Sequence, residues 1–236
     1  MRFHALLLLA CLSAPAARAA QVYIDNNELN YIGSISEEAN KQAFELYAAQ
    51  TKKPMVLNIR SGGGETMAGM ELGRWVARQA LPVKVVEYCF SSCANYVFTA
   101  APSRVVSNFA MVGFHGGLSS TSFALDAETE ASFATLPESE RQAARKKIMD
   151  ALFAEIAPKV QLERKFFDEI GVQQRITTLG QTDEYEKRYG SSDAVGWTYT
   201  VEDFSKLGVR NIAVVNPPWK PRSVLNKTAL FTVNVD

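Results

Sequence analysis

Short apolar segments alternate with amphipathic ones along most of this chain. The apolar runs are nearly continuous, which is typical of strands buried on both faces of a parallel sheet. They span residues 55–59, 82–87, 104–106, 111–114, 197–200 and 212–215. Residues 22–24 and 28–33 flank a turn and predict a strand pair. Strands that alternate with helices predict an α/β fold with a mainly parallel sheet covered by helices.

Helical periodicity fills the segments between these strands. The predicted helices span residues 36–52, 66–79, 91–99, 137–171 and 201–207. Ser36 is placed to cap the first of them, and Pro158 is expected to kink the long fourth one. Residues 118–137 predict a mobile surface segment, and residues 180–190 predict a loop. Prolines follow the last apolar run, so residues 216–236 predict an irregular tail with one more strand at 229–235.

Composition argues against several classes of protein. The 236 residues carry 25 Lys and Arg against 25 Asp and Glu, so the chain lacks the basic field that holds a nucleic-acid backbone. Two histidines and three cysteines are too few for a structural zinc module. We therefore expect no nucleic-acid partner, no metal and no cofactor. No apolar run reaches the length of about 20 residues that a membrane span requires.

The N-terminus has the parts of a secretory signal peptide: a short basic start, the apolar run 5–12 and the small-x-small pattern 17–19. Cleavage after Ala19 predicts a protein exported to the bacterial periplasm, with a domain at 20–215 and a tail at 216–236. Processing as a lipoprotein at Cys11 is the alternative. Cleavage after Ala19 leaves 23 basic residues against 25 acidic ones, a single histidine, His115, and two cysteines, Cys89 and Cys93.

Three segments that could carry chemistry follow predicted strands, where open α/β sheets place their sites. Residues 62–64 are glycines, which let main-chain N–H groups converge on an oxyanion. Ser91 and Ser92 stand at a strand-to-helix turn, where the helix dipole favours an alkoxide. His115 lies among glycines at a strand end. Each segment by itself also fits a structural role, as a glycine turn, a helix cap or an ordinary histidine.

Together the three segments resemble one family. The segments that carry the resemblance are Ile59-Arg60-Ser61-Gly62-Gly63-Gly64 with Ala68-Gly69, Ser92-Cys93-Ala94 with Ala100-Ala101, and the strand leading to His115. Their order and spacing resemble the ClpP-like serine peptidases of the ClpP/crotonase superfamily, the exported members in particular, over residues 21–215. The resemblance implies a ClpP/crotonase-like spiral of ββα units.

The family's functional residues map onto this chain as follows. The resemblance makes Ser92 the nucleophile and His115 its general base, with the N–H groups of Gly64 and Cys93 as the oxyanion hole. Ser91 remains the rival nucleophile, by a shift of one residue.

Two features of the motif stay open. Gly196 stands where the family has its triad aspartate, so either Asp193 or a backbone carbonyl is expected to hold the imidazole. Cys89 and Cys93 bracket the serine turn at a spacing that allows the Cα separation of roughly 4.4–6.8 Å needed by a disulfide. An oxidising compartment favours that bond, and two buried thiols are the alternative.

The resemblance therefore implies an exported serine hydrolase, a peptidase that cleaves peptides or unfolded segments through an acyl-enzyme without ATP. A non-catalytic binding or assembly module on the same scaffold is the alternative. A third reading is CoA-thioester chemistry of the crotonase type, which export and the pairing of Ser92 with His115 disfavour. By the same resemblance, a homo-oligomer is an expected assembly.

Overall fold

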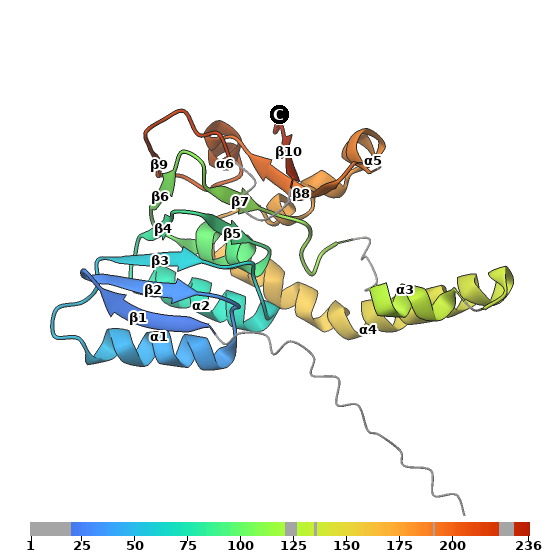
Figure 1. Ribbon diagram of the computed structural model, residues 1–236, viewed down its shortest axis with the longest axis horizontal. Coiled ribbons are helices and arrows are strands. Elements are labelled where there is room, and N and C mark those ends of the chain that lie inside the picture. Colours follow the sequence, from blue (N-terminus) through green and yellow to red (C-terminus); the bar gives the residue numbers. More distant parts are fainter. Residues whose placement is uncertain (1–19, 121–126, 135, 191, 222–228) are drawn as a thin grey trace, which may run out of the picture.

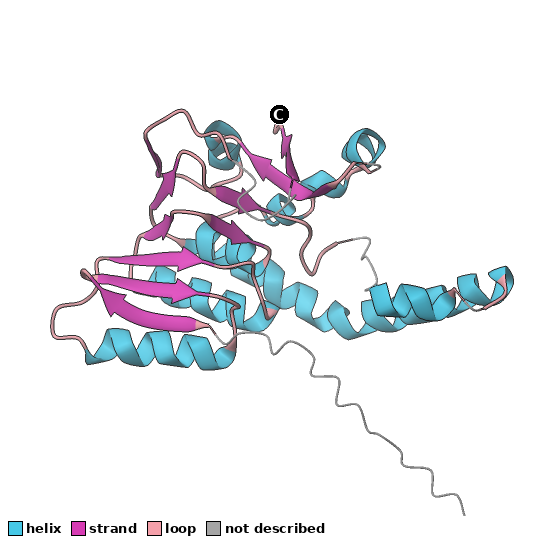
Figure 2. Ribbon diagram, in the orientation of Figure 1, coloured by secondary structure: helices cyan, strands magenta, loops and turns pink. Residues whose placement is uncertain are grey.

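A six-stranded sheet forms one layer of the protein, with helices packed against it (Figures 1 and 2). The computed structural model describes residues 20–120, 127–134, 136–190, 192–221 and 229–236; the predicted signal peptide and Cys11 lie outside this part. The sheet is parallel except where β1 pairs with β2, which confirms the expected mixed α/β class. In spatial order its strands are β1 Gln21–Asp25, β2 Glu28–Ile32, β3 Val56–Arg60, β4 Val83–Val85, β6 Arg104–Ser107 and β9 Ile212–Val215.

Local sequence explains the first elements. Asn26 and Asn27 both have positive φ, of 47° and 63°, a conformation that asparagine tolerates and that a tight hairpin turn requires. The expected cap of the first helix is present: the Ser36 side chain accepts a hydrogen bond from the Ala39 N–H at the start of α1, Glu37–Ala49. Both features depend on neighbouring residues alone, which is why the sequence predicts them.

Short strands continue from the main sheet and carry the chain towards the candidate site. β5, Tyr88–Phe90, pairs in parallel with β7, Met111–Gly113, and β8, Ala194–Tyr199, pairs in parallel with β10, Ala229–Val233. A single bridge from Ser61 to Cys89 joins the end of β3 to β5, and another from Phe114 to Trp197 joins the end of β7 to β8. The ends of β3, β5 and β7 are thereby brought to one place.

The remaining helices differ in how far they are buried. α2, Thr66–Arg78, packs against a π-helix, η1, Cys93–Phe98, which follows the serine turn. α4, Glu138–Ile170, continues through Pro158 and extends beyond the rest of the fold, with α3, Ala127–Phe133, beside its outer part (Figure 1). Other short elements complete the chain: 3-10 helices at Gln174–Thr177 and Leu179–Gln181, α5 at Asp183–Tyr189 and α6 at Val201–Lys206.

Three expectations from the sequence are wrong in detail. Residues 180–190 include the helix α5 rather than being only a loop, because a buried Tyr185 anchors this short polar helix. β9 is an edge strand with Val215 exposed, not a strand buried on both faces. On α4, Ile156 is buried while Ile148 is 39% exposed, so the apolar stripe meets the core only at its C-terminal part. The proposed boundary at residue 215 stays a prediction.

No helix in the described part of the chain is long and apolar enough to cross a bilayer.

Candidate active site

A serine and the one described histidine lie in direct contact where β5 and β7 end. The Oγ atom of Ser91 is 2.8 Å from Nε2 of His115. Ser91 directly follows β5 and His115 comes two residues after β7, and these two strands are paired. Since parallel strands end at the same edge, pairing brings together two residues that are 24 positions apart in the sequence.

The backbone around Ser91 holds its side chain out of the sheet. Ser91 has a φ of +56°, which costs a residue other than glycine of the order of 1–3 kcal/mol and is typical of functional turns. Its N–H donates to the Gly113 carbonyl at 3.0 Å, and its carbonyl accepts from the Asn95 N–H at 2.8 Å. The turn is therefore fixed from the strand before it and from the helix after it.

Ser92, expected as the nucleophile, has a different contact. The residue is 4% exposed, and its hydroxyl donates to the Gly64 carbonyl at 2.8 Å. The left-handed conformation at Ser91 turns the next residue inward, against Gly69 of α2. We therefore correct the pairing: the geometry places Ser91, the rival in the sequence motif, beside His115, and Ser92 ties the glycine loop to the helix.

The environment of His115 favours a neutral ring. The imidazole stacks on Phe90, with ring centroids 5.2 Å apart and planes inclined by 21°. Desolvation lowers the pKa of His115 below its ordinary value, and a hydrogen bond involving its own backbone raises it by less. The residue before it, Phe114, exchanges two backbone hydrogen bonds of 2.8 Å with Trp197. A neutral imidazole held in this way can accept the Ser91 proton.

The structure does not bring Asp193 to the histidine. Asp193 is exposed just before β8, and no carboxylate of the described residues hydrogen-bonds the His115 ring. Gly196 cannot be an aspartate in this backbone, because a Cβ there would lie 2.0 Å from the Phe114 carbonyl oxygen. The close approach of β8 to the end of β7 therefore leaves no room for a side chain at position 196.

The glycine loop lies directly against Ser91. Gly63 and Gly64 have φ values of +103° and +152°, and a Cβ on Gly63 would lie 2.6 Å from the Ser91 Cβ. The Gly63 N–H donates to the Ser61 hydroxyl at 3.1 Å. With Ser91 as the attacking group, the following N–H belongs to Ser92 rather than to Cys93. Ser92 therefore takes the place of Cys93 beside Gly64 in the expected pair of oxyanion donors.

Cys89 and Cys93 form a disulfide, one of the two states that the sequence allows. Their Cα atoms are 5.3 Å apart, and both residues are fully buried. The bond closes a short loop with Ser91 at its middle. Because Cys89 lies in β5 and Cys93 begins the π-helix, the disulfide joins the two elements between which the serine turn is held.

Sequence reasoning missed Glu163, a fully buried carboxylate beneath the site. It accepts hydrogen bonds from the hydroxyl of Tyr96, the amide of Gln174 and two main-chain N–H groups, those of Leu118 and Ser119, at 2.7–3.1 Å. These bonds give both oxygens of the buried side chain hydrogen-bond partners. Burial and the nearby carboxylate raise the pKa of Tyr96 well above its ordinary value, so this hydroxyl remains a donor.

Glu163 connects the two halves of the site. Tyr96 belongs to the helix that follows Ser91, and residues 118–119 belong to the loop that follows His115. A signal was present in the sequence, because Glu163 lies seven residues after Ile156 and so shares its face of the helix, where an acidic residue is unexpected.

A cavity of about 570 Å³ contains the serine and the histidine, a size typical of small-molecule sites. Several lining side chains are aromatic, and sequence reasoning had assigned none of them to the site: Tyr96, Tyr185, Tyr189, Trp197 and Phe231. Glu186 is the single acidic side chain among the described lining residues, which include no lysine or arginine. The described residues also contain no group of three or more His, Cys, Asp or Glu that could hold a metal ion.

No protein-family model and no curated protein matches this chain. The solved structures that match include three named as enoyl-CoA hydratases or as members of their family. The one from Thermoplasma volcanium has 11% identity, covers 39% of this chain and 49% of its own, and has a TM-score of 0.30. The enoyl-CoA hydratase from Mycobacterium avium subsp. paratuberculosis has 15% identity, covers 68% of this chain and 90% of its own, and has a TM-score of 0.31. The enoyl-CoA hydratase/isomerase family protein from Pseudomonas syringae has 12% identity, covers 64% of this chain and 93% of its own, and has a TM-score of 0.33.

This chain spans about half the length of the Thermoplasma protein. At such identities and TM-scores, the likeness does not identify a reaction for this chain.

The comparison corrects the enzyme class expected from the motifs. The three solved structures are named as enoyl-CoA hydratases or as members of their family, and none is named as a peptidase. These names disagree with the expected ClpP-like serine hydrolase or peptidase, so that assignment is withdrawn, and the peptide substrate is left without support. The motifs could not distinguish a peptidase from a hydratase. Glycine turns and residues at strand ends occur with either reaction, because both use main-chain N–H groups presented in the same way.

Proposed function

We propose that this protein is a crotonase-fold enzyme that transfers an acyl group through Ser91, with His115 as the base. The observation that carries the proposal is the 2.8 Å contact between Ser91 Oγ and His115 Nε2 inside a cavity. A serine hydroxyl becomes nucleophilic when an adjacent base accepts its proton. Ser91 also adopts the outward, left-handed turn that exposes such a hydroxyl.

The proposed step balances as follows. Ser91 Oγ forms a bond to the acyl carbonyl carbon while its proton moves to His115 Nε2. The tetrahedral intermediate then collapses, the bond to the leaving group breaks, and His115 returns the proton to that group. An acceptor with an O–H or N–H group takes the acyl group from Ser91 by the reverse sequence. The N–H groups of Gly64 and Ser92 are the donors for the oxyanion, each worth about 3 kcal/mol in comparable enzymes.

A short activated ester tests the proposal. The protein without residues 1–19 is mixed with 4-nitrophenyl acetate, nitrophenol release is followed, and the intact mass is measured after an acid quench. We expect a burst of nitrophenol and a mass increase of one acetyl group, located on Ser91 by peptide mapping. A folded protein that forms no adduct on Ser91 would contradict the proposal and would favour the non-catalytic binding module.

The pH dependence of acyl transfer follows from the pKa of His115. Only the neutral ring accepts the serine proton, so kcat/KM should rise with pH through the pKa of the free enzyme. Desolvation lowers that pKa below its ordinary value, so the midpoint is expected below about 6.5. Kinetics from pH 4.5 to 8, with NMR titration of His115 in the trimmed protein, measure both values. A midpoint above the ordinary value would contradict this assignment.

Export remains part of the proposal. The predicted signal peptide motivates it, and the Cys89–Cys93 disulfide supports it because such bonds persist in oxidising compartments. Expression of the full chain in a bacterium should yield a periplasmic protein that begins at Ala20. Recovery of the uncleaved chain from the cytoplasm would contradict export.

A further inference from the structure

Three aromatic side chains form one wall of the active-site cavity, and we call Tyr185, Tyr189 and Phe231 the aromatic wall. The rings of Tyr189 and Phe231 are stacked, with centroids 4.3 Å apart and planes 7° apart. Tyr185 stacks on Phe231 at 5.6 Å and 18°. These near-parallel rings come from α5 and β10, which are distant in the sequence from Ser91 and His115.

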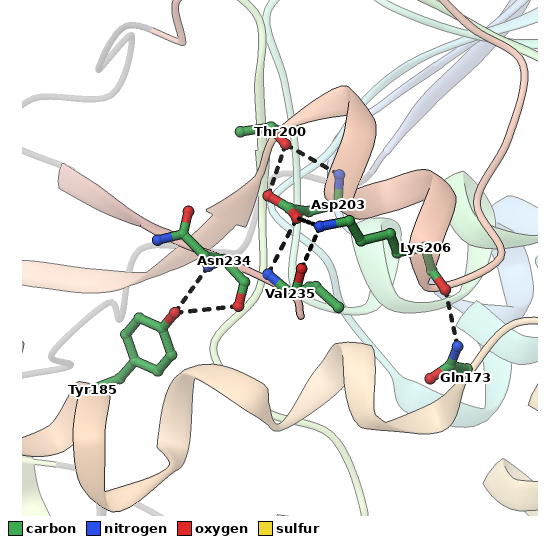
Figure 3. Close-up of polar contacts among 7 residues, drawn as sticks. All are labelled: Gln173, Tyr185, Thr200, Asp203, Lys206, Asn234 and Val235. Carbon is green, nitrogen blue, oxygen red and sulfur yellow. Dashed lines mark hydrogen bonds and ion pairs between the residues drawn. The ribbon is translucent and has the colours of Figure 1, made fainter.

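The C-terminal strand that supplies Phe231 is anchored by polar contacts (Figure 3). The Tyr185 hydroxyl accepts from the Asn234 N–H at 2.8 Å. The Asp203 carboxylate accepts from the Val235 N–H at 3.1 Å, and the Lys206 ammonium donates to the Val235 carbonyl. These contacts hold the aromatic wall in the fold, although the sequence predicts an irregular tail at residues 216–236.

The charge of the Asp203 anchor is maintained at neutral pH. Burial alone would raise the pKa of Asp203, but hydrogen bonds from Thr200, the Val235 N–H and Lys206 outweigh it and lower the pKa below its ordinary value. The lowered pKa keeps this carboxylate ionised at neutral pH, so the wall keeps its anchor there.

The electrostatics of the cavity select against anions. Among the described residues, its lining holds no lysine or arginine, and its single acidic residue is Glu186. Arg188 lies over the Tyr189 ring, 5.3 Å from its centroid, but it is not among the residues that line the cavity. An anionic substrate would therefore lose its hydration without a cationic partner in the described lining. An uncharged apolar group would instead bury its surface against the aromatic wall.

We infer that the aromatic wall is the acyl-binding pocket and that the group delivered to Ser91 is uncharged and apolar, with an extended or flat shape. This inference rests on the proposed acyl transfer. It adds the substrate class, and it assigns Tyr189 and Phe231 as residues that determine specificity.

Rates of acyl transfer from a series of 4-nitrophenyl esters test the inference. From acetyl to hexanoyl, kcat/KM should rise by up to about fourfold for each methylene buried, and by at least about tenfold overall. The hemisuccinyl ester, which is anionic, should react at least about tenfold more slowly than the butyryl ester. Glu186→Gln should reduce this discrimination against the anion. Equal rates for acetyl and hexanoyl esters, or a faster anionic ester, would overturn the inference.

Variants locate the preference on the aromatic wall. Tyr189→Ala should lower the ratio of hexanoyl to acetyl rates by about tenfold, whereas Tyr185→Phe retains the ring and most of the ratio. Tyr23→Ala is the matched control, because Tyr23 is an exposed aromatic residue on β1 that does not line the cavity. An unchanged ratio in folded Tyr189→Ala would reject the assignment of the wall.

Direct binding separates this inference from the proposed chemistry. Titration calorimetry of the unmodified protein should show that hexanamide binds more tightly than acetamide, and more tightly than hexanoate. This result is expected even if Ser91 never forms an adduct, in which case only the acyl-transfer proposal fails. Adducts on Ser91 without a chain-length preference in rate or binding would reject only the pocket.

Discussion

Replacing Ser91 with alanine should lower acyl transfer by about 10⁴-fold, while replacing Ser92 should lower it by less than about tenfold. Only the Ser91 hydroxyl lies beside His115, at 2.8 Å. The Ser92 hydroxyl donates to the Gly64 carbonyl, and its removal leaves the Ser92 N–H in place. The two variants should fold alike, apart from about 1 kcal/mol for the hydrogen bond lost in Ser92→Ala.

Single-turnover rates with 4-nitrophenyl acetate and urea unfolding of both variants provide the measurement. Each variant is a control for the other, because both remove a hydroxyl oxygen from adjacent residues of one turn. If Ser92→Ala abolished transfer while Ser91→Ala retained it, the chemistry would belong to Ser92, as the sequence resemblance implies. If both variants lost acyl transfer while both remained folded, the two serines of the turn would act as a unit.

Removing the disulfide should impair the site more than the fold. The bond closes a loop of only a few residues, so the chain-entropy relation gives roughly 2 kcal/mol of stabilisation. That bond, however, joins β5 to the π-helix on either side of Ser91, whose φ is +56°. Once the turn can relax, Ser91 should move out of line with His115. A displacement of about 1 Å can cost about 10²-fold in rate.

The double variant Cys89→Ala/Cys93→Ala, compared with the oxidised parent, measures both effects by urea unfolding and by the burst rate. His115 NMR titration in the variant reports whether the serine contact persists. A destabilised variant that transfers acyl groups at the parent rate would show that the disulfide only stabilises the fold. A stable but slow variant would show that it positions the serine.

Local features of the sequence predicted several parts of the structure. Ser36 was placed at the start of a helix, and the apolar strands were predicted to form a mainly parallel sheet. Each depends on short-range chemistry: a hydroxyl that reaches a nearby N–H, or an apolar run long enough to be buried. The glycine loop, the serine turn and His115 were found for the same reason, since each directly follows a strand.

Long-range features were predicted less well. Tyr185 and Phe231 are 46 residues apart, and only the anchoring of β10 places their rings in one wall. Glu163 could be seen as an acidic residue on an apolar helix face, but its partners come from two other segments. The enzyme class expected from the motifs was wrong, because such motifs describe a main-chain geometry that can serve different reactions, not the group that enters the cavity.

The sequence by itself determined the α/β class, the strand-end segments and the small set of residues available for acid–base chemistry. Only the tertiary structure decided which serine faces His115. The directions of the Ser91 and Ser92 hydroxyls depend on the backbone torsion at Ser91, which the identity of the residue does not set. It also decided that position 196 must be glycine, because β8 approaches the Phe114 carbonyl too closely for a side chain. Both outcomes are set by contacts between strands far apart in the chain.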